Sequence, residues 1–108
     1  MRIILACAAG MSTSMLAKNM LHAADERGVS VTVEAMSTSA LDDGQWRSAD
    51  VVLIGPQMRH QLATLVARGA SYDVPVEAIP PRDYATANGA NVLEFAISLV
   101  RPTGDSAQ

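Results

Sequence analysis

Cysteine and aromatic residues are scarce in this 108-residue sequence, which has one Cys, one Trp, one Phe and two Tyr. A single cysteine cannot close a disulfide within the chain, so we expect a reducing, cytoplasmic environment. With so few rings the core must be aliphatic, and the 49% of hydrophobic residues can supply it. The length suits one domain with one core.

Basic residues are also few. The chain has eight Lys and Arg against eleven Asp and Glu, which gives a net charge of -3. This balance argues against a nucleic-acid partner, which needs a basic surface. No apolar run approaches the roughly 20 residues of a membrane helix, so we expect no direct membrane insertion. His22 and His60 lie at no metal-ligand spacing from each other or from Cys7. We therefore predict no metal and no other cofactor.

Short apolar segments alternate with helical patterns along the chain. We expect strands over residues 2–6, 29–36, 49–54 and 74–79. We expect helices over 14–27, 57–68 and 88–100, with a weak helix or turn over 39–46. This alternation predicts an α/β fold: a doubly wound, four-stranded parallel sheet in the order 2-1-3-4, with helices on both faces. The domain should span residues 1–101, followed by a flexible tail at 102–108.

The sequence also predicts the local conformation or burial of four residues or pairs. Pro80-Pro81 should force an extended exit from the fourth strand. Met15 should pack in the core beneath the first helix, and Val66 should lie on the inner face of the helix over 57–68. Trp46 should cover the core as a lid.

Cys7 lies where the first apolar strand should end. The loop that follows is small or hydroxyl-bearing apart from one methionine. Its members are Ala8, Ala9, Gly10, Met11, Ser12, Thr13 and Ser14. Such a loop can turn several backbone N–H groups toward one anion, and the following helix N-terminus adds a positive dipole. Both favour a thiolate and a bound phosphate. The alternative is a small buried hydrophobe, but the strand-end position favours a reactive thiol.

The spacing after Cys7 is similar to the phosphate loop of cysteine-dependent phosphatases, in which Arg and then Ser or Thr follow. Here Thr13 stands in the arginine position and Ser14 follows it. A guanidinium would hold the phosphoryl oxygens and stabilise transfer to water. Without it, the loop can hold a phosphoryl group on sulfur but should promote hydrolysis poorly. The pattern therefore favours a phosphoryl carrier.

Three segments together resemble the IIB component of the lactose/cellobiose family of phosphotransferase systems. They are CAAGMSTS at residues 7–14, ADVVLIGPQ at 49–57, and RDY at 82–84 with Asn88-Gly89. The resemblance covers about residues 2–100. It implies a fold similar to that of low-molecular-weight tyrosine phosphatases. It also implies a phosphoryl relay in which Cys7 accepts phosphate from a phosphohistidine on the IIA protein. Cys7 would then pass the phosphate to a sugar, a β-linked disaccharide, held by the membrane permease IIC.

Six further residues are candidates for secondary or partner contacts near this edge of the sheet. They are Gly55, Pro56, Gln57, Arg59, Asp83 and Tyr84. Asp83 has two interpretations: a general acid, as in low-molecular-weight phosphatases, or a turn residue whose carboxylate binds nearby backbone N–H groups. The second is favoured because the arginine is missing. A cysteine phosphatase with Asp83 as its acid therefore remains one alternative. A binding domain with an inert buried thiol is another.

Overall fold

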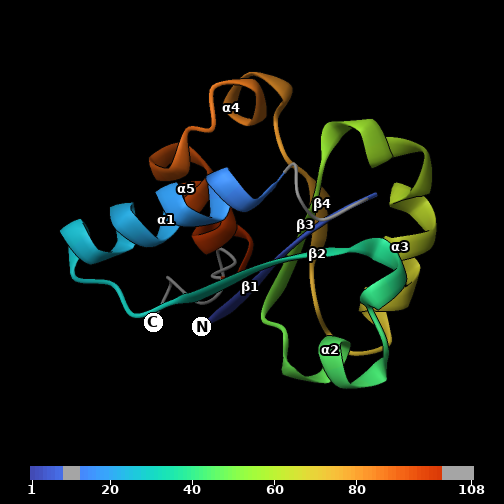
Figure 1. The fold of residues 1–108 in the computed structure, drawn as a ribbon. Helices are drawn as coiled ribbons and strands as arrows, with labels where there is room; N and C mark the ends of the chain where they lie inside the picture. Colours follow the sequence, from blue (N-terminus) through green and yellow to red (C-terminus); the bar gives the residue numbers. More distant parts are fainter. Residues whose placement is uncertain (9–12, 101–108) are drawn as a thin grey trace.

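The computed structural model describes residues 1–8 and 13–100, and their strands form a single sheet (Figure 1). The strands are β1 (Arg2–Cys7), β2 (Thr32–Ser37), β3 (Val51–Ile54) and β4 (Val76–Ala78). All pairings are parallel, and the order across the sheet is β2-β1-β3-β4. This is the predicted order 2-1-3-4, so the predicted fold class is confirmed.

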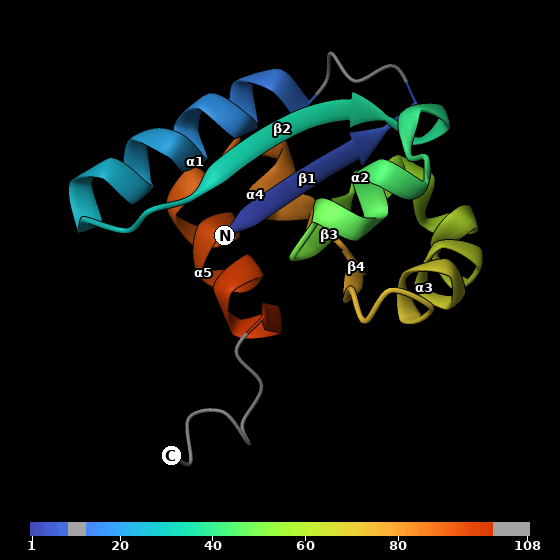
Figure 2. The ribbon, with the colours of Figure 1, turned by 90° about the horizontal axis from the view of Figure 1, so that it is seen from below.

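Helices cover both faces of the sheet (Figures 1 and 2). One face carries α1 (Ser14–Arg27) and α5 (Gly89–Val100), and the other carries α2 (Asp43–Ser48) and α3 (Leu62–Ala70). The connections include two 3₁₀ segments, η2 (Thr38–Ala40) and η3 (Pro56–Gln61), and the short helix α4 (Pro81–Ala85). Along the described ranges, none of the helices has the length and apolar character needed to cross a membrane.

Side chains of β1 alternate between two cores, as a strand buried on both faces requires. Ile3 and Leu5 belong to the core under α1 and α5, whereas Ile4 and Ala6 belong to the core under α2 and α3. β3 alternates in the same way, with Leu53 on the α1/α5 face and its neighbours on the other. This alternation decides which side chains share a face at the ends of the strands.

A tight contact between two helices fixes α5 against α1. A Cβ placed on Gly89 would lie only 2.3 Å from the backbone carbonyl carbon of Asn19 and 2.6 Å from the nitrogen of Met20. The side-chain amide of Asn19 also donates to the backbone oxygen of Ala87 at 2.8 Å. Glycine is therefore required where α5 begins, and the segment just before α5 is tied to α1.

The second strand and the third helix differ from the expected boundaries. β2 begins at Thr32 rather than at residue 29, because the N–H of Val29 closes the end of α1 on the oxygen of Ala24 at 2.9 Å. The helix expected from residue 57 opens instead with the 3₁₀ segment η3 and becomes α-helical only at Leu62. A 3₁₀ turn is common at the start of a helix.

The prediction of an extended exit at Pro80-Pro81 is correct only for Pro80. Pro81 is the first residue of α4, and the N–H of Tyr84 donates to the oxygen of Pro80 at 3.0 Å. Proline suits the first position of a helix, because its φ is already helical and its missing N–H would have had no intrahelical partner.

Predictions for three apolar side chains were also wrong. Met15 is 62% exposed, because the buried stripe of α1 runs through Leu16 and Met20 instead. Val66 is 42% exposed, since α3 buries the neighbouring Leu65. Trp46 is not a lid but is fully buried in the core under α2 and α3.

Candidate functional site

The carboxyl ends of the central strands bring together segments that are far apart in the sequence. Cys7 ends β1, and the backbone N–H of Gly55, just after β3, donates to the oxygen of Ala6 at 2.9 Å. The N–H of Ile79, just after β4, donates to the oxygen of Ile54 at 2.9 Å. The strand order reverses between β1 and β3, which is where ligands bind in open α/β sheets.

Cys7 and Thr13 meet at this switch point. Their Sγ and Oγ1 atoms are 3.8 Å apart, and neither residue is exposed to solvent. Thr13 occupies the N-cap position of α1 but makes no capping hydrogen bond with its side chain. Its hydroxyl lies within hydrogen-bonding distance of the sulfur, and the amino end of a 14-residue helix starts beside Cys7.

Most of the predicted phosphate loop lies outside the described residues. Ala9, Gly10, Met11 and Ser12 lie outside the described residues, as does the predicted tail at 102–108. Ala8 and Ser14, at the two ends of the loop, are exposed. The roles predicted for these residues stay predictions.

Gln57 folds back over Gly55 and reaches Tyr84. A Cβ placed on Gly55 would lie 2.7 Å from the Oε1 of Gln57, so the carboxamide occupies the space that glycine leaves open. The Nε2 of Gln57 donates to the hydroxyl of Tyr84 at 3.2 Å. This hydrogen bond joins the segment after β3 to α4.

Asp83 is held by the start of α5. Its Oδ1 accepts from the Nδ2 of Asn91 at 3.1 Å, and its backbone oxygen accepts from the N–H of Asn88 at 2.9 Å. Asn88 in turn accepts the N–H of Asn91 on its side-chain Oδ1 at 3.0 Å. The carboxylate thus binds a side-chain amide, whereas the turn interpretation expected backbone N–H groups.

Arg59, His60 and Arg82 are exposed on the segments that follow β3 and β4. Within the described residues, neither arginine forms an ion pair. Pro56, at the start of η3, is half-buried. In the same part of the chain, no three His, Cys, Asp or Glu side chains are grouped so that they could hold a metal ion.

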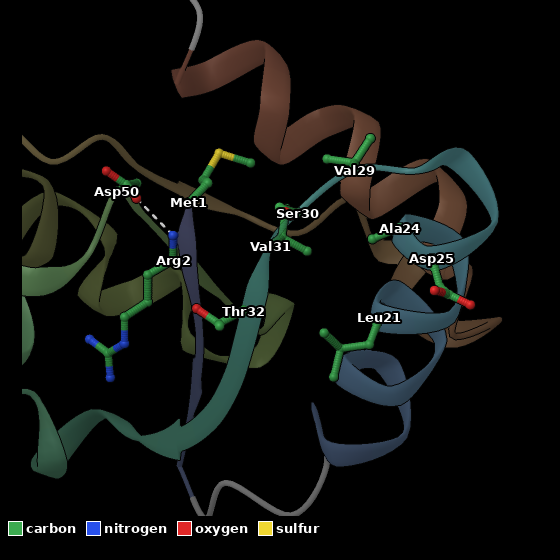
Figure 3. Close-up of a pocket in the computed structure, with 10 residues that line it drawn as sticks. All are labelled: Met1, Arg2, Leu21, Ala24, Asp25, Val29, Ser30, Val31, Thr32 and Asp50. Atoms are coloured by element: carbon green, nitrogen blue, oxygen red, sulfur yellow. Dashed lines mark hydrogen bonds between the residues drawn. The ribbon is translucent and has the colours of Figure 1, made fainter.

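An open hollow of about 570 Å³ lies at the other end of the sheet (Figure 3). Met1 and Arg2, where β1 begins, line it together with Leu21 of α1 and Thr32 of β2. From Arg2 to Cys7, β1 spans about 16 Å at the usual rise of a strand. The hollow is therefore separate from the site around Cys7.

Comparison with known proteins identifies the family. A family model described as "PTS system, Lactose/Cellobiose specific IIB subunit" matches residues 2–95. The chain belongs to this family. Such IIB components are phosphotransferase components of sugar transport that work with IIA and IIC partners. The resemblance predicted from the three segments is confirmed.

Curated relatives agree over nearly the whole length of the chain. The oligo-β-mannoside-specific EIIB component of Bacillus subtilis (strain 168) is 36% identical over 99 residues, covering 92% of this chain and 95% of that protein. The cellobiose-specific EIIB component of Lactococcus lactis subsp. lactis (strain IL1403) is 35% identical over 102 residues, covering 91% and 94%.

Solved IIB structures share the fold. The solution structure of a cellobiose-specific IIB protein from Borrelia burgdorferi aligns with a TM-score of 0.76 at 37% identity, covering 93% of this chain and 91% of that chain. The lactose-specific IIB domain from Streptococcus pneumoniae gives a TM-score of 0.77 at 14% identity, covering 92% and 96%. A mutant of YwlE from Bacillus subtilis has a low-molecular-weight tyrosine phosphatase-like fold. It aligns with a TM-score of 0.53 at 17% identity, covering 94% of each chain.

The sequence named Gln57 and Tyr84 as separate candidates and did not predict that they bind each other. The sequence feature that could have indicated this contact is the glycine two residues before Gln57, which leaves room for the Gln57 side chain to fold back. Cys7 and Thr13, in contrast, were predicted to share one loop, and the structure brings their side chains together.

Proposed function

We propose that Cys7 accepts a phosphoryl group from a phosphohistidine on the IIA protein and passes it to a sugar bound by IIC. The observation that carries this proposal is the position of the sulfur at the carboxyl end of β1, with the Thr13 hydroxyl 3.8 Å away and the amino end of α1 beside it. A helix N-terminus and nearby donors stabilise the charge of a thiophosphate.

Each transfer exchanges one bond to phosphorus for another. In the first, the Cys7 thiolate attacks phosphorus, the S–P bond forms, and the P–N bond to the donor histidine breaks. The histidine nitrogen keeps the electron pair and takes up a proton. In the second, a sugar hydroxyl oxygen attacks phosphorus, the S–P bond breaks, and the thiolate is restored as the hydroxyl proton is released. Positioning supplies most of the catalysis in such transfers.

Thr13 favours transfer to a partner over transfer to water. A neutral hydroxyl stands where cysteine phosphatases carry a guanidinium that stabilises the charge of hydrolysis. The hydroxyl can still donate a hydrogen bond to a thiolate or a phosphoryl oxygen. The site therefore supports a phosphocysteine that persists until a suitable acceptor arrives.

The proposed sugar is a β-linked disaccharide, and the proposed location is the cytoplasm. The sugar class is supported by membership of the lactose/cellobiose family and by relatives named as specific for cellobiose and oligo-β-mannosides. The pocket that selects the sugar would belong to IIC.

Labelling with ³²P-phosphorylated IIA protein tests the first step. The label should appear on the peptide that contains Cys7, as identified by mass spectrometry, and it should be absent from Cys7→Ser. Label that persists in Cys7→Ser on a histidine would overturn the proposal.

The burial of Cys7 favours one second candidate, a binding domain with an inert thiol. The two candidates differ in how the native protein reacts with iodoacetamide. A relay cysteine must become accessible, so it should be alkylated at a rate comparable to that of a free thiol or faster. Alkylation that requires unfolding would favour the inert thiol.

A further inference from the structure

Gln57 and Tyr84 share a face of the sheet with Cys7. In β1, Leu5 lies on the α1/α5 face and Ala6 on the other, so Cys7 returns to the α1/α5 face. In β3, Ile54 lies on the α2/α3 face. The next residue, Gly55, has an extended backbone, so a Cβ on it would point toward α1 and α5. The ring of Tyr84 packs against the same α1/α5 core.

The lateral distance between Cys7 and Gly55 is short. Ala6 and Ile54 are partners in the parallel ladder, so the next residues on each strand, Cys7 and Gly55, are neighbours at about the 4.8 Å spacing of adjacent strands. The Gln57 carboxamide lies directly over Gly55, 2.7 Å from the place of its missing Cβ. A phosphoryl group on the sulfur projects farther from β1 than the thiol does.

We propose that Gln57 and Tyr84 form a neutral hydrogen-bonding wall that positions the phosphoryl group on Cys7. This inference rests on the proposed phosphoryl relay and assigns two positioning residues to it. The Gln57 amide carries two N–H hydrogens and donates one of them to the hydroxyl of Tyr84, which leaves the second for a phosphoryl oxygen. The wall thus offers an uncharged amide donor in a site that lacks the phosphatase guanidinium.

Uncharged donors suit a carrier. They orient phosphoryl oxygens without adding the positive charge that would stabilise attack by water. The hydrogen bond between Gln57 and Tyr84 fixes the amide plane, so the second amide hydrogen of Gln57 keeps one direction. Gly55 is part of this arrangement, because any Cβ there would displace the carboxamide.

Three variants disturb the wall in different ways. Gly55→Ala pushes the Gln57 carboxamide aside while leaving both partners present, and the fold should survive because a flexible side-chain end can move. Tyr84→Phe removes only the hydroxyl and keeps the packed ring. Gln57→Glu replaces the amide with a carboxylate that repels phosphate.

Matched controls lie outside the wall. Tyr72→Phe removes a tyrosine hydroxyl that binds Asp43 near the opposite end of the sheet. Gln61→Glu adds the same charge as Gln57→Glu in the same segment η3, beside His60. Neither residue belongs to the proposed site.

Rapid-quench transfer from ³²P-phosphorylated IIA separates positioning from partner binding. All three wall variants should lower the rate at saturating IIA by about tenfold or more, the loss expected when a hydrogen bond to a charged group is removed. The half-saturating IIA concentration and the melting temperature should stay near the wild-type values, and both controls should transfer normally. Wall variants that match the wild-type rate, or that change only the half-saturating IIA concentration, would overturn the inference while leaving the relay intact. Failure of the wild-type protein to accept label would overturn the relay itself.

Discussion

The hydroxyl of Thr13 lies 3.8 Å from the sulfur of Cys7, and both residues are fully buried. A neutral hydroxyl beside a buried sulfur can hydrogen-bond either to a thiolate or to a phosphoryl group on it. A charged guanidinium in the same place would do more, because it would also stabilise hydrolysis. This one contact supports the proposed role of a phosphoryl carrier over that of a phosphatase.

Replacing Thr13 with valine should slow phosphorylation of Cys7 by about 10- to 100-fold. Valine keeps the shape but removes the hydroxyl, and a hydrogen bond to a charged group contributes about 1.5–3 kcal/mol. Thr13→Ser keeps the hydroxyl and should retain most of the rate. The measurement is single-turnover transfer from phosphorylated IIA. A valine variant as fast as the serine variant would show that the hydroxyl plays no part.

Exposed arginines at the carboxyl edge should speed association with a phosphorylated partner. Arg59 and Arg82 follow β3 and β4, and within the described chain neither is in an ion pair. The double variant Arg59→Gln with Arg82→Gln should lower the association rate severalfold at low salt, with a smaller effect at high salt, because screening weakens steering. Stopped-flow mixing with IIA measures this.

Arg47 provides the matched control for charge. It is equally exposed, lies in α2, and forms no ion pair with any described residue. Arg47→Gln removes one positive charge from another part of the surface, so it is compared with the single variants Arg59→Gln and Arg82→Gln. If it slows association as much as either single variant does, the effect comes from net charge and not from the edge near Cys7.

Gly89→Ala should destabilise the fold by several kcal/mol. The new Cβ would lie 2.3–2.6 Å from backbone atoms of Asn19 and Met20, which cannot move without shifting α1. Overpacking against side chains alone costs about 1–3 kcal/mol, and backbone is less able to yield. Urea unfolding measures the change. Gly44→Ala is the control, because its Cβ meets only Asp42 Oδ1 at 3.5 Å, and it should be neutral or slightly stabilising.

The hydroxyl of Tyr72 should lose its proton at a higher pH than an unperturbed tyrosine does. The hydrogen bond from Tyr72 to Asp43, at 2.6 Å, raises the pKa of Tyr72 above the usual 10.0, with desolvation and the Asp43 charge adding to the effect. A raised folded-state pKa means that this stabilisation is present below pH 10 and is lost as the pH rises through the folded pKa. Ultraviolet titration should give a late phase that disappears in Tyr72→Phe and shifts downward in Asp43→Asn. An unchanged late phase in Asp43→Asn would contradict the assigned cause.

The fold could be predicted from local sequence patterns, because apolar periodicity and the rules for connecting parallel strands allow few topologies. The β1 and β3 segments are continuous apolar runs, and Gly28, with φ of 69°, ends α1 as its sequence position suggests. Pro81 and Met15 were misjudged for local reasons. The role of a proline depends on the helix that follows it, and Met15 lies one position outside the stripe of Leu16 and Met20.

The site was predictable only where its parts are close in the sequence. Cys7 and Thr13 are six residues apart, so strand, loop and helix signals place them together. Gln57 and Tyr84 are 27 residues apart, and their contact depends on how α4 returns over the sheet edge. Asp83 and Asn91 are only eight residues apart, but their contact also depends on tertiary packing, because the start of α5 folds back against α4. Contacts of this kind follow from tertiary packing and not from spacing.

The fate of the phosphoryl group on isolated phospho-Cys7 protein tests the relay most directly. The ³²P-labelled protein is divided between buffer alone and membranes that contain IIC with a β-linked disaccharide, and the products are separated by chromatography. The relay predicts that label stays on Cys7 in buffer and moves rapidly into sugar phosphate with the membranes and sugar. Release as inorganic phosphate at the same rate in both samples would contradict it and point to a phosphatase.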